Sequence, residues 1–216
     1  MCINYISRDG RRRQAGFSLL EIVIVASIVL AATAAAVLNI LPSIKSSRSN
    51  AGMEIVLGEL RRAHERAVDE RRIYRVTFAA PNSIQVDVGT VGIVGSTVTG
   101  SAPNFVPAQT ALTLPGSVQF VVVPGIPTNP LFTPDGLGRG ANAIDFDLAS
   151  GGGGMQIYFQ PDGRALDVGN RLNDGVAYLA EPNDLSSSRA VSLYGSTGRA
   201  KGWILSTSNG AVKWTQ

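Results

Sequence analysis

An uncharged apolar segment near the N-terminus constrains this chain more than any other feature. Residues 22–44 form a run of 23 positions without a charged side chain. As a helix this run would be roughly 35 Å long, which is enough to cross a hydrocarbon core of roughly 30 Å with some tilt. The sequence therefore predicts one transmembrane helix.

Basic residues are concentrated on the N-terminal side of this segment. Residues 1–16 contain four arginines against one acid, Asp9, whereas only Lys45 and Arg48 follow the segment closely. Because flanking positive charges stay on the cytoplasmic side, we expect the N-terminus in the cytoplasm and the rest of the chain outside.

One carboxylate, Glu21, lies at the start of the apolar run. A cleaved secretory signal is the alternative interpretation, because the three alanines at 34–36 are typical of a cleavage site. A signal peptide, however, has no use for an acid that costs about 2.5 to 3.5 kcal/mol at mid-membrane on insertion scales, and less near an interface. We therefore expect Glu21 to have a partner.

The basic leader, Gly16, Phe17, Glu21 as the fifth residue counted from Phe17, and the hydrophobic helix together resemble the N-terminal signal of type IV pilins and type II secretion pseudopilins. The resemblance implies that a prepilin peptidase cleaves between Gly16 and Phe17 and N-methylates Phe17. It also implies that Glu21 neutralises the amine of Phe17 on the next subunit during assembly, and close opposite charges do attract strongly at low dielectric.

Removal of the leader would change the net charge of the chain and its cysteine content. The formal charge of +3 comes entirely from residues 1–16, and Cys2, the single cysteine, also lies there. A mature protein starting at Phe17 would be neutral, which gives no overall attraction to nucleic acid or anionic lipid. Without a disulfide, the extracytoplasmic part has to depend on its hydrophobic core.

An amphipathic pattern continues the helix beyond the apolar run to about residue 72. Apolar side chains recur at spacings of three and four from Met53 to Ala67, with charges on the other faces. Pro42 removes a backbone donor, so we expect a bend there, and Gly52 and Gly58 weaken the helix further.

Short apolar or alternating runs follow, separated by Gly, Pro, Asn and Asp. We expect strands at residues 74–78, 84–88, 118–123, 144–148, 155–159, 176–179, 190–194, 203–206 and 212–214, and mobile loops at 89–107 and 150–154. The predicted fold is α+β: a long, kinked N-terminal helix, transmembrane then amphipathic, packed on an antiparallel β-sheet head. The predicted parts are a cleaved leader (1–16), a membrane and assembly helix (17–44), and a periplasmic head (45–216) that comprises the amphipathic helix (45–72) and a β-rich part (73–216).

No pattern of catalytic or metal-binding residues stands out. His64 is interpreted as an ordinary helix residue, and phosphate-loop, zinc and nucleophile-elbow spacings are absent from the sequence. Acidic clusters at 145–147, 162–163 and 167–174 lack the spacing of an EF-hand and are typical of turns. We expect no catalytic residue, no metal and no cofactor.

The last 32 residues, 185–216, contain four basic side chains and no acid: Arg189, Arg199, Lys201 and Lys213. The segments IYFQPDGRA (157–165) and RAVSLYGSTGRAKGWIL (189–205) resemble the GspH/FimT branch of pseudopilins. Some minor pilins of that branch bind DNA through a Gly-Arg-x-Arg turn, which implies a phosphate-binding role for Arg199 and Lys201, with Arg189 and Lys213 as helpers. Lys201 replaces the usual arginine and loses its bidentate fork. The cysteine that often follows is also absent.

The leading interpretation is a non-enzymatic assembly protein: a minor pseudopilin of the H type in a type II secretion or related pilus machine. Its expected partners are the prepilin peptidase, sibling pilins and the inner membrane. The alternative is a FimT-like minor pilin that binds DNA during uptake. A signal-anchored periplasmic enzyme is the third possibility, and it requires a mature protein that does not begin at Phe17.

Overall fold

The computed structural model describes residues 18–89, 104–208 and 211–216, and all side chains in these ranges except those of residues 35–42, 130 and 208. The chain divides into two compact units, Met1–Pro42 and Ser43–Gln216. Each unit is described by itself below.

Helix α1 (Leu19–Asp69) runs through both units. The helix ends at Asp69, three residues before the predicted end at about residue 72. Arg71 takes a left-handed backbone (φ 53°), and the amide of Arg72 donates to the carbonyl of Ala67, as in a Schellman cap. The predicted bend at Pro42 falls at the boundary between the units and stays a prediction. Among the described residues, no helix combines the length and the hydropathy that a membrane crossing needs.

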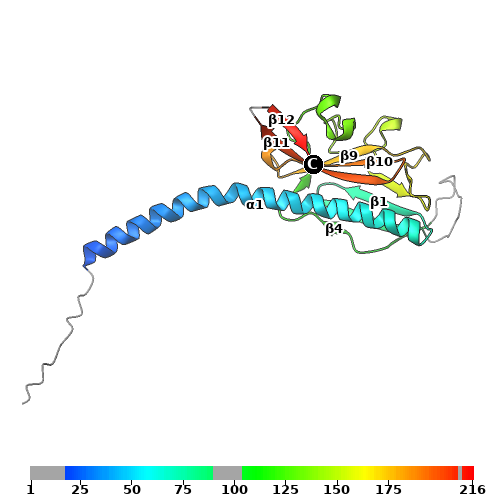
Figure 1. Ribbon diagram of the computed structural model, residues 1–216. Coiled ribbons are helices and arrows are strands. Elements are labelled where there is room, and N and C mark those ends of the chain that lie inside the picture. Colours follow the sequence, from blue (N-terminus) through cyan, green and yellow to red (C-terminus); the bar gives the residue numbers. More distant parts are fainter. Residues whose placement is uncertain (1–17, 90–103, 209–210) are drawn as a thin grey trace, which may run out of the picture. The chain divides into compact units, whose positions relative to one another are not determined.

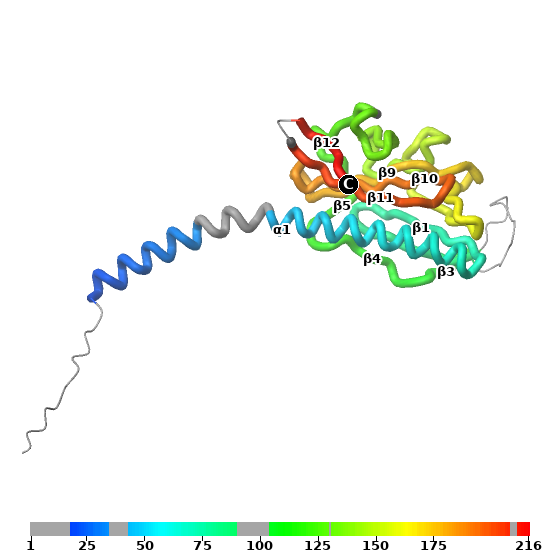
Figure 2. Tube along the Cα trace, viewed as in Figure 1, coloured from blue at the N-terminus to red at the C-terminus, as the bar shows by residue number. Residues whose placement is uncertain are grey.

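Two antiparallel sheets of six strands each follow α1 (Figures 1 and 2). The first sheet has the order β3-β2-β1-β7-β8, with β4 also paired to β2. Its strands are β1 (Tyr74–Ala79), β2 (Ser83–Gly89), β3 (Phe105–Pro107), β4 (Leu112–Thr113), β7 (Gln156–Phe159) and β8 (Ala165–Leu166).

The second sheet has the order β12-β11-β10-β9-β5, with β6 also paired to β9. Its strands are β5 (Gln119–Phe120), β6 (Ile144–Asp145), β9 (Gly175–Ala180), β10 (Arg189–Tyr194), β11 (Arg199–Ser208) and β12 (Ala211–Thr215). Four short 3-10 helices lie in the connections: η1 (Pro130–Phe132), η2 (Pro134–Gly136), η3 (Leu148–Ser150) and η4 (Leu185–Ser187).

The main core forms where the second half of α1 meets one face of each sheet. Leu60 of the helix belongs to the same buried cluster as Phe78 of the first sheet and Leu193 of the second. A smaller cluster, which includes Tyr178 and Trp214, lies on the opposite face of the second sheet. Because β9 has apolar neighbours on both faces, all six of its residues are buried.

The predicted fold class, an N-terminal helix packed on antiparallel sheets, is confirmed. Several boundaries were wrong. The predicted strand 118–123 is reduced to the two residues of β5, and the predicted strand 144–148 to the two of β6, before η3 begins. The predicted loop 89–107 contains β3 at its end, because the backbone of residues 105–107 pairs with β2. Residues 90–103 lie outside the described residues.

Candidate functional site

Glu21 lies in the first turn of α1, where a carboxylate interacts favourably with the positive end of the helix dipole. The amides of Glu21 and Ile22 both donate to the carbonyl of Ser18, so the helix begins directly before the predicted assembly residue. Gly16 and Phe17, the predicted cleavage site, lie outside the described residues.

The apolar side chains around Glu21 are exposed within the N-terminal unit. Leu19 is 81% exposed and Leu30 is 69% exposed. All described side chains from 18 to 34 are exposed. So much apolar surface on one helix is unfavourable in water, which indicates that this segment is built to contact lipid or other protein.

Arg189, one of the four basic residues predicted to contact DNA, is buried at 2% exposure. Its guanidinium donates to the side chains of Asn50 (2.6 Å) and Ser46 (2.9 Å) on α1, and to the carbonyl oxygens of Ser186 and Ser188. Burial lowers the pKa of Arg189, partly offset by the charge of Asp184. The side chain thus fastens α1 to the start of β10 and is not presented to solvent.

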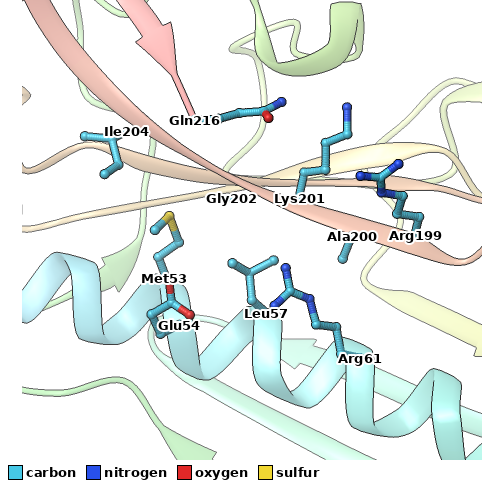
Figure 3. A pocket seen from close by; sticks show the side chains of 10 residues that line it. All are labelled: Met53, Glu54, Leu57, Arg61, Arg199, Ala200, Lys201, Gly202, Ile204 and Gln216. Atoms are coloured by element: carbon cyan, nitrogen blue, oxygen red, sulfur yellow. The ribbon is translucent and has the colours of Figure 1, made fainter.

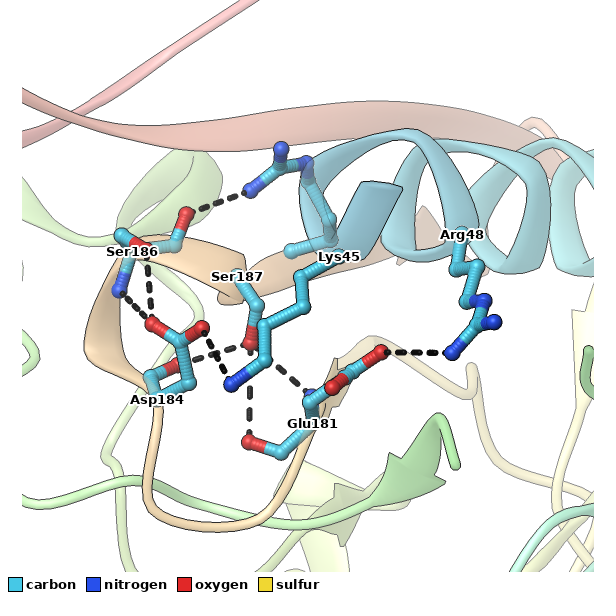
Figure 4. Close-up of polar contacts among 7 residues, drawn as sticks. Lys45, Arg48, Glu181, Asp184, Ser186 and Ser187 are labelled. Carbon is cyan, nitrogen blue, oxygen red and sulfur yellow. Dashed lines mark hydrogen bonds and ion pairs between the residues drawn. The ribbon is translucent and has the colours of Figure 1, made fainter. Parts of the chain in front are cut away.

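Two ion pairs support the same junction (Figure 4). Lys45 lies 3.7 Å from the carboxylate of Asp184, and Arg48 lies 3.9 Å from that of Glu181. Asp184 also caps η4 by accepting from the amide and the hydroxyl of Ser186. The Ser186 hydroxyl is the main reason that the pKa of Asp184 lies below its usual value, and Lys45 contributes to the decrease.

Lys201 forms an ion pair with Asp135, which lies 66 residues earlier in the sequence. Its ammonium lies 2.7 Å from one oxygen of Asp135 in η2, and the other oxygen accepts from the hydroxyl of Ser192 on β10. The same hydroxyl accepts from the indole of Trp203, and the ammonium lies 5.8 Å from the rings of both Tyr194 and Trp203. Lys201 thus fixes η2 to the outer face of the second sheet.

Arg199 and Lys213 are the two exposed members of the predicted basic set. Lys213 lines a hollow of about 350 Å³ together with Trp203, Trp214 and the exposed Phe132. Arg199 lies at the start of β11. The structure therefore does not bring the four basic residues together into one exposed surface.

Arg61 is a residue that the sequence patterns did not single out. With Arg199 it lines a hollow of about 390 Å³ between α1 and β11, shown in Figure 3, and a second one of about 220 Å³ next to His64. Among the described residues neither guanidinium has an ion-pair or hydrogen-bond partner. Arg61 stands in a run of helical charges, so no local signal separates it from Arg62, which pairs with Glu59.

The acidic clusters and the single histidine have structural contacts. Burial raises the pKa of Asp147, and its hydrogen bond with Asp167 adds to the increase. The ring of His64 lies 3.1 Å from the carbonyl oxygen of Gly163 and packs edge-on against Phe159. Within the described ranges, no group of three or more His, Cys, Asp or Glu side chains could hold a metal ion. The expected absence of a metal stays a prediction.

Comparison with known proteins gives one family match. The model of the prokaryotic N-terminal methylation motif matches residues 11–37, which include Gly16, Phe17 and Glu21. No curated protein matches the chain significantly. Among solved structures, the type IV minor pilin FimU of Pseudomonas aeruginosa matches with 12% identity and a TM-score of 0.40, over 70% of this chain and 85% of that one.

The predicted N-terminal signal is thus confirmed as a motif. The matched residues 11–37 include the start of α1, the helix whose second half packs on the antiparallel sheets. The chain carries the prokaryotic N-terminal methylation motif at residues 11–37.

Proposed function

We propose that this protein is a minor pseudopilin of the H type, a structural subunit of a type II secretion pseudopilus or a related type IV pilus machine. Residues 1–16 are the cytoplasmic leader that prepilin peptidase removes. Residues 17–44 hold the protein in the inner membrane before assembly and enter the fibre afterwards. Residues 45–216 form the periplasmic head.

The observation that carries this proposal is the position of Glu21. It lies within the matched motif, in the first turn of α1, and the described side chains around it, from 18 to 34, are all exposed. A carboxylate in such surroundings is stabilised by a positive group from another molecule. The methylated amine of Phe17 on a neighbouring subunit supplies that charge in this proposal.

The proposed role is mechanical. The main core joins the second half of α1 to both sheets, so a pull on the helix is transmitted to the head. Repeated head-to-tail contacts between subunits generate an open helical fibre instead of a closed dimer. An assembly subunit of this kind needs no catalytic group.

The test compares Glu21→Gln with a matched control, Asp69→Asn, which removes an exposed carboxylate from the other end of the same helix. Both variants are expressed in cells that lack the wild-type copy, and the protein is quantified in membranes and in sheared fibres. We expect normal amounts of both variants in membranes, but at least about tenfold less Glu21→Gln in fibres. Equal recovery of the two variants in fibres would refute the role of Glu21.

The second candidate function is DNA binding by a FimT-like minor pilin. The specific observation that favours it is Arg199, which is exposed and has no partner among the described residues, in a tail segment without acids. The commitment of Lys201 to Asp135 and the burial of Arg189 leave few cations for phosphate. Binding through so few contacts would be weak and salt-sensitive.

Duplex DNA is titrated into the full-length protein in detergent at two salt concentrations, in parallel with Arg199→Ala, Lys201→Ala and the double variant. The DNA function predicts binding that weakens with salt and is lost in the double variant. Binding that is absent, or equal in all four proteins, would remove this candidate. Loss of secretion with intact DNA uptake in a deletion strain would favour the pseudopilin.

A further inference from the structure

One edge of β11 is only half covered. Strand β10 pairs with residues Arg199 to Ile204, whereas β12 pairs with the other edge only from Ile204 to Ser208. The stretch from Arg199 to Trp203 thus has a strand on one side and, within the described part of the chain, none on the other. An open strand edge is a template for another extended segment.

The backbone groups on this open edge belong to Ala200 and Gly202. In an antiparallel ladder, successive residues direct their amide and carbonyl alternately to one neighbour and then to the other. The amide of Leu205 donates to the carbonyl of Ser188 on the β10 side. By alternation, Trp203 and Lys201 also face β10, and Ala200 and Gly202 face the open side.

A hollow of about 390 Å³ accompanies this edge. Its floor is formed by Met53 and Leu57 of α1, which lie so close to Gly202 that a Cβ there would be 2.7 Å from Leu57 Cδ1. Gln216, which directly follows β12, lines the hollow at one end. Figure 3 shows the helix below the strand with Met53 and Leu57 directed toward it. An added strand would therefore continue the line of β12 above an apolar floor.

The charges around the hollow are asymmetric. Arg61 and Arg199 line it without a partner among the described residues, whereas Lys201 is neutralised by Asp135. Glu54 also lines the hollow, beside Met53 on α1 and away from the two arginines. Two unpaired guanidiniums at the Arg199 end of an open edge favour an occupant that carries carboxylates there.

We propose that an extended acidic segment of a neighbouring subunit adds to the open edge of β11 as a strand. The five residues from Arg199 to Trp203 offer about 17 Å of edge. The segment runs antiparallel to β11, in the direction of β12, and places its carboxylates near its C-terminal end, opposite Arg61 and Arg199. This mode of binding takes affinity from the backbone and specificity from the charged ends. The inference rests on the proposed assembly function and names the chemistry of one contact.

The test measures binding of a fluorescein-labelled peptide, TVTVEE, to the full-length protein in detergent by fluorescence anisotropy. Two control peptides replace both glutamates by glutamine, or carry N-methyl groups on alternate residues so that they cannot pair as a strand. We expect each control peptide to bind at least about tenfold more weakly. The glutamine peptide loses the charge-assisted hydrogen bonds to the arginines, and the N-methylated peptide loses its backbone hydrogen bonds to β11. Equal binding of the three peptides would overturn the proposal.

Protein variants locate the site. Arg61→Ala and Arg199→Ala each remove an exposed side chain and are expected to weaken binding about tenfold. Lys213→Ala, which removes an exposed cation from β12, is expected to leave binding unchanged. Hydrogen exchange at the amides of Ala200 and Gly202 should slow when the peptide is bound. An unchanged exchange rate, or an effect of Lys213→Ala as large as that of Arg199→Ala, would contradict the site.

Two further measurements distinguish this inference from failure of the assembly function and from phosphate binding. The Glu21→Gln variant should bind the peptide like wild type, so failure of the assembly function and failure of the strand site give different results. A single-stranded oligonucleotide of equal charge should not compete with the peptide. Competition by the oligonucleotide would show that the arginines recognise phosphate and would overturn the proposal.

Discussion

Two glycines on α1 and β11 show how the surroundings decide what a single residue contributes. Among the described residues, a Cβ at Gly58 would meet no atom within 4 Å apart from the backbone of its own helix and its chain neighbours, whereas a Cβ at Gly202 would lie 2.7 Å from Leu57 Cδ1 and 3.0 Å from Met53 Sδ. The first glycine weakens a helix without a packing role. The second allows the strand to approach the helix closely enough to close the core.

We therefore predict opposite effects of the same substitution. Gly58→Ala should raise the free energy of unfolding by about 0.5 to 1 kcal/mol, because alanine favours the helix. Gly202→Ala should lower it by about 1 to 3 kcal/mol, because Leu57 and Met53 have to move. Urea denaturation of the two full-length variants in detergent measures both values. Equal signs for the two substitutions would contradict the packing described for Gly202.

The pH dependence of stability should contain a contribution from Asp184. Its pKa is lowered in the folded state, first by the Ser186 hydroxyl. Its contribution is therefore complete above the pKa of the unfolded chain, about 4, and is lost as the pH falls through the lower folded value. Asp184→Asn should reduce stability at pH 7 by about 1 kcal/mol. The difference in stability between the variant and the wild type should shrink below about pH 4. A difference that does not depend on pH would refute this contribution of the Asp184 carboxylate.

At the scale of elements, η2 is fixed to the second sheet by one polar cluster. Asp135 bonds Lys201 of β11 and Ser192 of β10, and Tyr194 donates to the carbonyl of Asp135. The side chain of Asp135 is 7% exposed and that of Lys201 is 26% exposed. An ion pair shielded from water to this extent couples its two elements more strongly than a surface pair.

A double-mutant cycle measures this coupling. Asp135→Ala and Lys201→Ala should each destabilise the protein, and the coupling energy between them should be about 1 to 2 kcal/mol. Asp135→Ala should also speed amide exchange in η2, because its main anchor is lost. Additive effects of the two substitutions would show that the contact at 2.7 Å contributes little to stability.

Some elements could be predicted from the sequence because their pattern is local. The spacing from Met53 to Ala67 predicts the buried face of α1, and the alternation in β1 predicts the side that faces the core. The two-residue strands β4 and β8 could not be predicted, because a partner backbone, and not their own pattern, defines them.

The basic residues of the tail show the same division between local and distant information. The sequence shows how many basic residues the tail has. The burial of Arg189, however, depends on Ser46 and Asn50, and the neutralisation of Lys201 depends on Asp135. All three partners are far away in the chain. Arg61 could not be predicted either, because only the fold brings it next to Arg199.

At the scale of the whole molecule, the chain combines a segment that exposes apolar surface with a head that buries it. The exposed side chains between 19 and 30 have no use in an isolated soluble protein, and the motif that contains them ends at residue 37. The second unit, from Ser43 to Gln216, contains both buried clusters. This division suits the proposed assembly function, in which the subunit passes from the membrane into the fibre without unfolding its head.

The central claim is that the N-terminal segment is a processed assembly signal, and mass spectrometry of the mature N-terminus tests it most directly. The protein is purified from membranes of cells that contain a prepilin peptidase, and in parallel from cells that lack it. We predict an N-terminal peptide that begins at methylated Phe17 in the first sample and the intact leader in the second. A mature N-terminus after the alanines at 34–36, or identical N-termini in both samples, would contradict the account.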